Sequence, residues 1–273
     1  MARRPAEPEV IWDRPQRATR GPRPAYTRAD IAAAAVRIAD EGGLDAVTMR
    51  HVAAELGCAT MSLYNYVPRK EDLYELMVDL VGGEYALPDK PSGHWRADLT
   101  DLARQARAMM HRHPWVPRLM SPVYGFSPNA LAYLEYALSC LDGLEGTYGA
   151  KLELVAMVNG LVTAYVANEL ATAERDRSLP WPPEREHAVR SAYLGRALAS
   201  GRYPRLAASL VENEGPIDLD GAFDRALERL LNSFEKTLGG TDGPGGSEGT
   251  GGSGRSEATG GSDGSGGSGG AGA

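Results

Sequence analysis

Residues 48–70 read TMRHVAAELGCATMSLYNYVPRK, a sequence that predicts two short helices in close succession. A first short helix, over 48–56, has its apolar side chains on one face and ends at Gly57. A second short helix, over 60–67, ends before Pro68, which cannot continue it. Two short helices joined by so tight a link predict a helix-turn-helix.

A supporting helix is predicted on the N-terminal side of this pair. Residues 28–41 repeat apolar side chains at three- and four-residue spacing, Thr27 can cap the start, and two glycines follow the end. A further helix opens at Lys70. Any helical bundle could show one of these features, so the spacing by itself leaves DNA binding undecided.

The stretch from Tyr26 to Gly82 resembles the N-terminal domain of the TetR family of transcriptional regulators nearly end to end. Its segments VTMRHVAAELG, SLYNYV and RKEDL stand at the family's spacing without a gap. The resemblance implies an all-α fold, with a three-helix helix-turn-helix head that binds DNA. A larger helical domain for ligand binding and dimerisation would follow.

The resemblance also assigns roles to matching positions of the head. Arg50 falls where related repressors place an arginine on a guanine edge, a contact that suits the guanidinium fork. Tyr64 and Lys70 match positions that hold phosphates, and Thr48 would add its hydroxyl or helix-start amides. The outward face of the second helix, which would set sequence preference, consists of Thr60, Met61, Ser62, Asn65 and Tyr66.

Simpler interpretations of these residues stay open. The ring of Tyr64 could pack in the core of the head, and Lys70 could be an ordinary exposed lysine beside Glu71. Met61 and Asn65 depart from the best-known pattern of the family, so no operator sequence can be transferred to this chain.

The charge distribution is compatible with a DNA-facing end. The 273-residue chain has a net charge of -7, whereas residues 1–70 alone carry eleven Lys and Arg against eight Asp and Glu. The acidic excess therefore lies on the rest of the chain. The two cysteines, Cys58 and Cys140, are too few for a disulfide framework or a zinc site, and we expect them to be small core residues.

The two ends of the chain are predicted to be disordered. Residues 1–25 form an arm rich in Arg and Pro, and residues 239–273 are almost entirely Gly, Ser and other small or polar residues. The arm could be a leader without a role, or Arg17, Arg20 and Arg23 could reach phosphates or a minor groove. Between the ends, we expect the DNA-binding domain over 26–84 and the helical ligand-binding and dimerisation domain over 85–238.

Two helices of the second domain have broad apolar faces, over 150–176 and 218–238. We expect them to pair with their copies in a four-helix dimer interface, although they could also pack only within one subunit. A dimer would place two recognition helices in successive major grooves, about 34–36 Å apart.

Polar, aromatic and sulfur-containing side chains on otherwise apolar helices are the candidates for a ligand pocket. They are Met109, His113, Trp115, Tyr124, Tyr133, Asn159, Thr163 and Tyr165. His111 and His113 lie on different sides of a helix, which is poor geometry for one metal ion, so no metal site or cofactor is expected. A Mg²⁺ ion carried by the ligand, as in tetracycline recognition, stays open.

The resemblance to the TetR family, together with these patterns, implies a ligand-responsive transcriptional regulator of the repressor type. It would bind a pseudo-palindromic operator in double-stranded DNA as a homodimer, and a small, largely apolar effector would release it. The alternative is an activator, or a regulator controlled by a protein partner. No phosphate loop, nucleophile elbow or HExxH motif indicates an enzyme. No membrane-spanning run or signal peptide is visible, and we expect a cytoplasmic protein.

Overall fold

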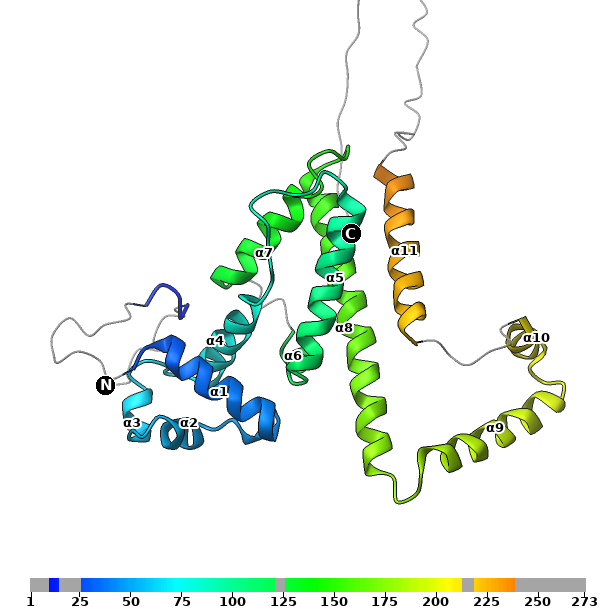
Figure 1. Cartoon of the computed structure of the whole chain (residues 1–273), viewed down its shortest axis with the longest axis horizontal. Coiled ribbons are helices and arrows are strands. Elements are labelled where there is room, and N and C mark those ends of the chain that lie inside the picture. Colours follow the sequence, from blue (N-terminus) through cyan, green and yellow to red (C-terminus); the bar gives the residue numbers. More distant parts are fainter. Residues whose placement is uncertain (1–9, 15–25, 121–125, 213–218, 239–273) are drawn as a thin grey trace, which may run out of the picture. The chain divides into compact units, whose positions relative to one another are not determined.

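The computed structural model describes residues 10–14, 26–120, 126–212 and 219–238, and within these ranges every regular element is a helix (Figure 1). This confirms the predicted all-α fold. Three groups of predicted features lie outside the described residues: Arg17, Arg20 and Arg23 of the arm, Tyr124 of the pocket, and the tail 239–273.

The head consists of three α-helices and a 3₁₀ turn. Thr27 caps the first helix as predicted, because its side-chain oxygen accepts a hydrogen bond from the Asp30 N–H while the Asp30 carboxylate accepts one from the Thr27 N–H. The elements are α1 (Arg28–Gly42), the 3₁₀ turn η1 (Leu44–Ala46), α2 (Met49–Glu55) and α3 (Thr60–Leu63).

A left-handed glycine sets the angle between α2 and α3. Gly57 has a φ of 66°, a conformation that a side chain disfavours, and the following Cys58 N–H bonds to the Ala53 carbonyl at 2.9 Å. The structure ends α3 at Leu63 rather than at the predicted residue 67. The N–H groups of the next turn bond back to the Leu63 carbonyl, and Pro68 prevents further helix.

Part of the predicted disordered arm is ordered. Residues 10–14 form a turn, and Ile11 is buried in the core of the head with 1% of its surface exposed. The Arg28 guanidinium donates to the carbonyls of Ile11 and Arg14, both at 2.9 Å. Burial of one isoleucine and the hydrogen bonds from the buried Arg28 offset the conformational entropy that these residues lose on ordering. The proline-rich composition by itself did not indicate this.

The rest of the described chain is helical: the helix that begins at Lys70 packs mainly against α1 of the head, and the helices that begin at Trp95, Val116, Pro128 and Leu219 contact the long helix that begins at Tyr148 and form the body with it. The two helices predicted over 150–176 and 218–238 extend over Tyr148–Ser178 and Leu219–Leu238. The helices are α4 (Lys70–Gly82), α5 (Trp95–Arg112), α6 (Val116–Leu119), α7 (Pro128–Ser139), α8 (Tyr148–Ser178), α9 (Pro183–Ala199), α10 (Pro204–Glu212) and α11 (Leu219–Leu238).

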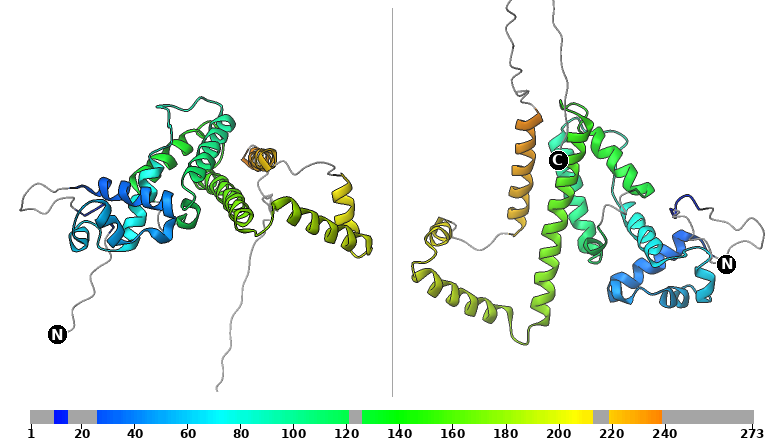
Figure 2. Two further views of the ribbon diagram at one scale, coloured as in Figure 1. Left: turned by 60° about the horizontal axis from the view of Figure 1, so that its bottom comes forward. Right: turned by 180° about the vertical axis from the view of Figure 1, so that it is seen from behind.

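One face of α8 supplies the core of the body. The buried side chains of α8 include Leu154, Val158 and Val162. The helices α5, α7 and α11 pack against α8, and Figure 2 shows α5 and α11 beside it. Ion pairs hold the outer helices in place, including Arg104 of α5 with Asp224 of α11 at 3.2 Å. Among the described residues, α8 alone is long and apolar enough to cross a membrane, a test that core helices of soluble proteins also pass.

The left-handed conformation of Gly57 gives a first prediction. Replacing Gly57 by Ala should lower the free energy of unfolding by about 1 kcal/mol, because an L-residue is strained at this φ. An added Cβ would meet no atom within 4 Å, so backbone strain is the only expected cause. Urea denaturation followed by circular dichroism measures it.

The matched control is Gly195→Ala, in the middle of α9, where an added Cβ also meets nothing within 4 Å. Here the φ is helical, so the variant should be as stable as the parent or more stable by up to about 1 kcal/mol. If both variants lost the same amount of free energy of unfolding, strain at the left-handed φ of Gly57 would not be the cause.

Candidate DNA-binding surface and ligand cavity

The outer face of α2 and α3 presents three side chains that are free to meet a ligand. Arg50 is exposed and forms no hydrogen bond or ion pair with any residue in the described ranges. Met61 is 75% exposed, and Asn65, in the turn after α3, is exposed as well. A guanidinium, a flexible apolar group and an amide can thus reach the base edges of a major groove.

The remaining residues of the expected reading face are only half-exposed. The Tyr66 ring packs against Tyr26, with ring centroids 5.2 Å apart, and Ser62 also interacts with the Tyr26 hydroxyl. The Cys58 side chain hydrogen-bonds to the same hydroxyl and raises the pKa of Tyr26. Thr60 is half-buried too. The freely exposed reading face is therefore narrower than the sequence predicted, because Tyr26 covers one side of it.

The expected phosphate contacts surround this face. Thr48 is exposed, and its hydroxyl accepts the His51 N–H at 3.1 Å as the N-cap of α2. Tyr64 and Lys70 are both exposed, with the Lys70 ammonium 5.2 Å from the centre of the Tyr74 ring. All three can face a phosphate backbone, so their predicted role remains open to test.

Sequence reasoning missed the contact that fixes the start of α4 beside Lys70. Asp72 is buried, accepts a hydrogen bond from the Arg69 N–H at 3.0 Å and pairs with the Arg69 guanidinium. The hydrogen bonds to Asp72 raise the pKa of Arg69. An acidic residue at the third helical position was the only signal for this contact in the sequence.

The body contains a cavity of about 140 Å³. It is lined by residues from α4, α5, α6, α7 and α8, most of them apolar. Three of the eight residues predicted to bind a ligand line it: Met109, Tyr133 and Asn159. The structure therefore brings residues from three separate helices together at one site, as a ligand pocket requires.

The polar groups of the cavity are uncharged. Tyr133 donates a hydrogen bond from its hydroxyl to Asn159 Oδ1 at 2.6 Å, and its ring lies 4.8 Å from that of Tyr85. Burial raises the pKa of Tyr133 to about 12 and also raises that of Tyr85. Both phenols are neutral at physiological pH.

Four other predicted pocket residues lie away from the cavity wall. Thr163 bonds to the Asn159 carbonyl at 2.8 Å, and Tyr165 packs edge-on against Phe223 of α11. His113 and Trp115 are engaged at the junction with the head. Sequence reasoning missed the polar lining residues Tyr85, Ser127 and Asn129, which lie at helix ends or in connections where helical periodicity carries no signal.

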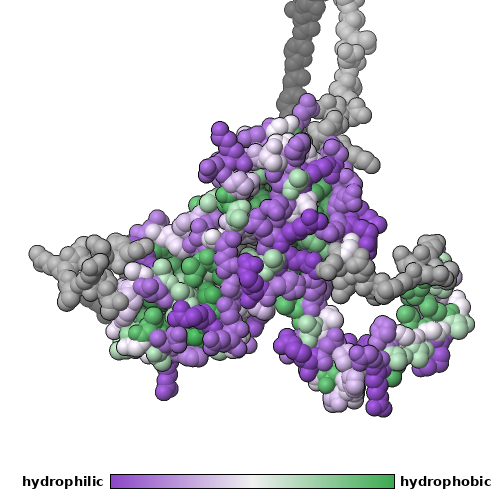
Figure 3. All heavy atoms as spheres, in the orientation of Figure 1, coloured by the Kyte–Doolittle hydropathy of each residue, from purple (hydrophilic) through white to green (hydrophobic). Residues whose placement is uncertain are grey.

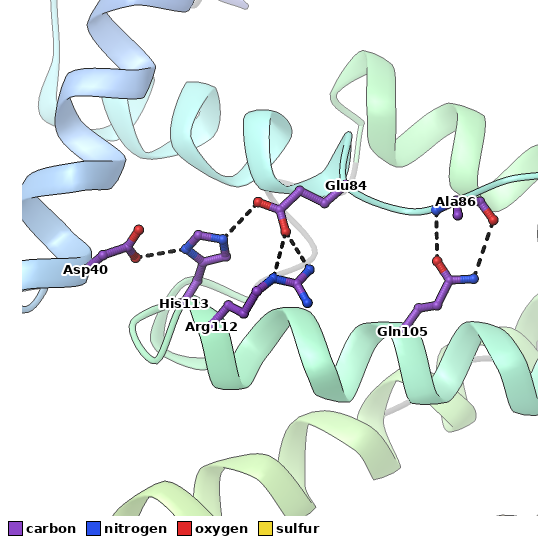
Figure 4. Close-up of polar contacts among 6 residues, drawn as sticks. All are labelled: Asp40, Glu84, Ala86, Gln105, Arg112 and His113. Atoms are coloured by element: carbon purple, nitrogen blue, oxygen red, sulfur yellow. Dashed lines mark hydrogen bonds and ion pairs between the residues drawn. The ribbon is translucent and has the colours of Figure 1, made fainter.

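A hydrogen-bonded bridge joins the head to the body (Figure 4). The buried ring of His113, just after α5, lies between two carboxylates: Nδ1 is 2.8 Å from Asp40 of α1, and Nε2 is 2.9 Å from Glu84, beyond the end of α4. The Trp115 indole also donates to Asp40, at 2.7 Å. His113 and Trp115 therefore lie outside the cavity wall, where their polar atoms have hydrogen-bond partners.

The Glu84 carboxylate is held in place from two sides. Arg112 donates to Glu84 Oε2 at 2.6 Å, and the neighbouring connection is fixed by Gln105, which accepts the Ala86 N–H at 2.8 Å (Figure 4). Partial burial acts to raise the pKa of Glu84, but hydrogen bonds from Arg112 and His113 outweigh it and lower that pKa. Glu84 therefore stays ionised at the junction.

The second histidine of this region has a different partner. His111 Nε2 lies 2.7 Å from Glu169 of α8, which also pairs with Arg107 at 2.8 Å. Among the described residues, no group of three or more His, Cys, Asp or Glu side chains is placed to hold a metal ion. Of the cysteines, Cys140 is buried and Cys58 half-buried, and burial raises the pKa of Cys140 to about 11.

Comparison with known families gives two matches that together span most of the described chain. Residues 31–77 match the family described as "Bacterial regulatory proteins, tetR family". Residues 87–238 match "Tetracyclin repressor-like, C-terminal domain". The first match ends within α4, and the second begins in the connection that follows this helix.

Individual relatives agree with these matches. The transcriptional repressor DrrR1 of Streptomyces coeruleorubidus is 36% identical over 230 residues, covering 83% of this chain and 84% of the relative. A helix-turn-helix transcriptional regulator of Saccharopolyspora erythraea is 30% identical, over 85% of this chain and 94% of its own. The crystal structure of ActR of Streptomyces coelicolor in complex with actinorhodin is similar with a TM-score of 0.64 and 25% identity, over 78% of this chain and 97% of ActR.

The bridge gives a prediction for stability. Glu84→Gln should lower the free energy of unfolding at pH 7 by about 1 kcal/mol, since the neutral amide weakens the bonds from Arg112 and His113. The folded pKa of Glu84 lies below its ordinary value of 4.5, so this contribution is complete above that pH. It should disappear as the pH falls through the lowered folded pKa.

Thermal denaturation between pH 7 and pH 3 tests this prediction. Glu41→Gln is the control, because Glu41 is exposed at the end of α1 and has no bonding partner within the described ranges. Its stability should follow that of the parent at every pH. A gap between the parent and Glu84→Gln that persists at the lowest pH would contradict the electrostatic explanation.

Proposed function

Because this chain belongs to the TetR family of transcriptional regulators, we propose that it represses transcription by binding a pseudo-palindromic operator as a homodimer. A small, largely apolar effector that enters the cavity releases it from DNA. The repressor DrrR1 among its relatives and the actinorhodin complex of ActR support both halves of this proposal.

The observation that carries the proposal is the position of α4, which reaches both sites. It begins at Lys70, beside the reading face, and its last turns line the cavity through Val78, Val81 and Gly82. Asn129 of α7, also in the cavity wall, donates from its backbone N–H and side-chain amide to Asp79 of α4. A ligand that displaces the wall therefore acts directly on the helix that leads to the head.

The bridge around His113 provides the second connection between cavity and head. Met109 lines the cavity one turn before His113 on α5, and His113 holds Asp40 of α1. An effector that shifts the end of α5 moves the head through this bond as well as through α4. The response is limited by how much more tightly the effector binds the displaced arrangement than the DNA-binding one.

The exposed face of α8 supports a homodimer. Ala156, Gly160, Ala164 and Ala167 are exposed along one side of this apolar helix, next to the exposed Leu152 and Met157. Small residues allow two helix backbones to approach closely, and larger apolar neighbours supply the buried area. We propose that α8 packs against its copy along this face, with α11 on its flank.

The connection between α8 and α11 carries further exposed apolar side chains. No residue of α9 is buried, and apolar atoms appear along α9 and α10 at the lower right of Figure 3. They belong in part to Val189, Tyr193, Leu206 and Leu210. A second copy of the chain is the partner that would cover these side chains. We also propose a cytoplasmic location, because the protein would act on operator DNA.

The DNA-binding half predicts a specific effect of Arg50. With an operator selected from a random-sequence library, Arg50→Ala should weaken binding about 5- to 150-fold and relax the preference at one base pair. Arg37→Ala removes the same charge from the head, but Arg37 pairs with Glu55 at 3.1 Å, and its affinity should change by less than a few fold. Fluorescence anisotropy at fixed salt measures both.

Failure to select any sequence from the library would refute the operator-binding proposal. Equal losses in Arg50→Ala and Arg37→Ala would show that Arg50 contributes only general charge. Selection of DNA that supports transcription in a reporter assay, instead of blocking it, would favour an activator.

The homodimer predicts the effect of a charge on α8. Ala164→Glu should shift the protein from dimer to monomer, because an unpaired carboxylate would be buried in the interface. Ala132→Glu, at an exposed position of α7 off this face, should remain dimeric. Light scattering after gel filtration measures the mass, and a dimer that survives Ala164→Glu would exclude this face as the interface.

A further inference from the structure

The walls of the cavity carry no group with a charge at neutral pH. Among the described residues that line it, only Tyr85 and Tyr133 can ionise, and burial keeps both protonated. An ion transferred into such a site loses its hydration and gains no opposite charge. A carboxylate, an ammonium group or a ligand-borne metal ion is therefore disfavoured, and the site selects a neutral ligand.

One hydrogen-bond donor in the wall is left without a partner. The Tyr133 hydroxyl donates to Asn159 Oδ1 and so fixes the orientation of the side-chain amide, while the main-chain carbonyl of Asn159 accepts a hydrogen bond from the Thr163 hydroxyl. No bond to Asn159 Nδ2 is formed by the residues that the structure describes. This NH₂ group can donate to an oxygen atom of a ligand in the cavity.

A second polar group in the wall is free for a structural reason. Ser127 precedes Pro128 at the start of α7, where a serine hydroxyl usually accepts a helix N–H. Here Asp79 of α4 accepts the N–H of Asn129 at 2.8 Å instead. The Ser127 hydroxyl is left buried, with 3% of the residue exposed, and no residue in the described part of the chain hydrogen-bonds to it. A ligand that forms a hydrogen bond to this hydroxyl would gain binding free energy, because the hydroxyl forms no other such bond.

Size and lining indicate an aromatic ring. A volume of about 140 Å³ is close to that of an engineered cavity, about 150 Å³, that binds benzene. The tilted rings of Tyr85 and Tyr133 offer aromatic faces, and Met109, Met110 and Met120 are flexible enough to make room for a larger molecule.

We propose that the effector is an electrically neutral, mainly aromatic compound with a carbonyl or hydroxyl oxygen, and that Asn159 recognises this oxygen through its amide nitrogen. Ser127 supplies a second hydrogen bond where the ligand carries another polar atom. This inference rests on the proposed function, because it names the chemistry of the same effector.

Three probes of nearly equal shape test the inference on the full-length protein. Acetophenone is neutral and carries a carbonyl oxygen, ethylbenzene lacks the oxygen, and benzoate is charged. Ligand-observed NMR titration should show acetophenone bound about tenfold more tightly than ethylbenzene, as one hydrogen bond provides. Benzoate should bind at least tenfold more weakly than acetophenone.

Variants then assign the preference to a residue. In Asn159→Leu, acetophenone should lose its advantage over ethylbenzene, and ethylbenzene should bind at least as well as before. Thr163→Val, one turn further along α8 and away from the cavity wall, is the control and should keep the parent's order of affinities. Circular dichroism verifies that each variant is folded. Ser127→Ala removes only a hydroxyl, and this variant should keep the preference for acetophenone over ethylbenzene.

The outcomes separate the two proposals. If the protein prefers acetophenone and Asn159→Leu abolishes this preference, the inference is supported. If saturating acetophenone does not release the protein from its operator, that result counts only against the proposed function. Benzoate binding as tightly as acetophenone, a preference unchanged in Asn159→Leu, or no binding of either neutral probe would each overturn the inference. Operator release by a compound found in a separate screen would then still uphold the regulator.

Discussion

The buried hydrogen bonds of His113 are the constraint on which the coupling of head and body depends. Both ring nitrogens lie within hydrogen-bond distance of carboxylates, those of Asp40 in the head and of Glu84 beyond the end of α4. A bond of this kind is costly to break, because it would leave charges unpaired in a partly buried junction. In the proposed response to an effector, this junction would pass movement of the body to the head.

The same rule, that buried polar groups require partners, distinguishes the junction from the cavity. At the junction, the Trp115 indole and the Glu84 carboxylate have their hydrogen bonds within the protein. In the cavity wall, the buried Ser127 hydroxyl and the Asn159 amide nitrogen have no hydrogen-bond partner among the described residues. Satisfied groups hold the chain in one arrangement, whereas unsatisfied groups leave free energy that a ligand can gain on binding.

The helix α8 combines two functions because it is apolar on more than one face. Val158 and Val162 complete the core of the subunit, and Asn159 reaches the cavity from the same helix. The opposite side, with Gly160 and Ala164, is exposed in the single chain. This two-sided apolar character also explains why the helix resembles a membrane span in length and composition. A dimer formed along α8 would place the ligand site close to the interface that sets the spacing of the two heads.

Local sequence determined the helices, the helix-turn-helix and the family, because helical periodicity, caps and the left-handed Gly57 act between residues close together in the chain. Which polar residues form the cavity depends on contacts between helices that are far apart in the sequence. Periodicity indicates that His113 and Asn159 face inward, but it does not indicate what each side chain meets there. His113 meets the Asp40 carboxylate, whereas Asn159 lines the cavity. The burial of Ile11, held through Arg28, likewise depends on contacts between distant segments that no local pattern encodes.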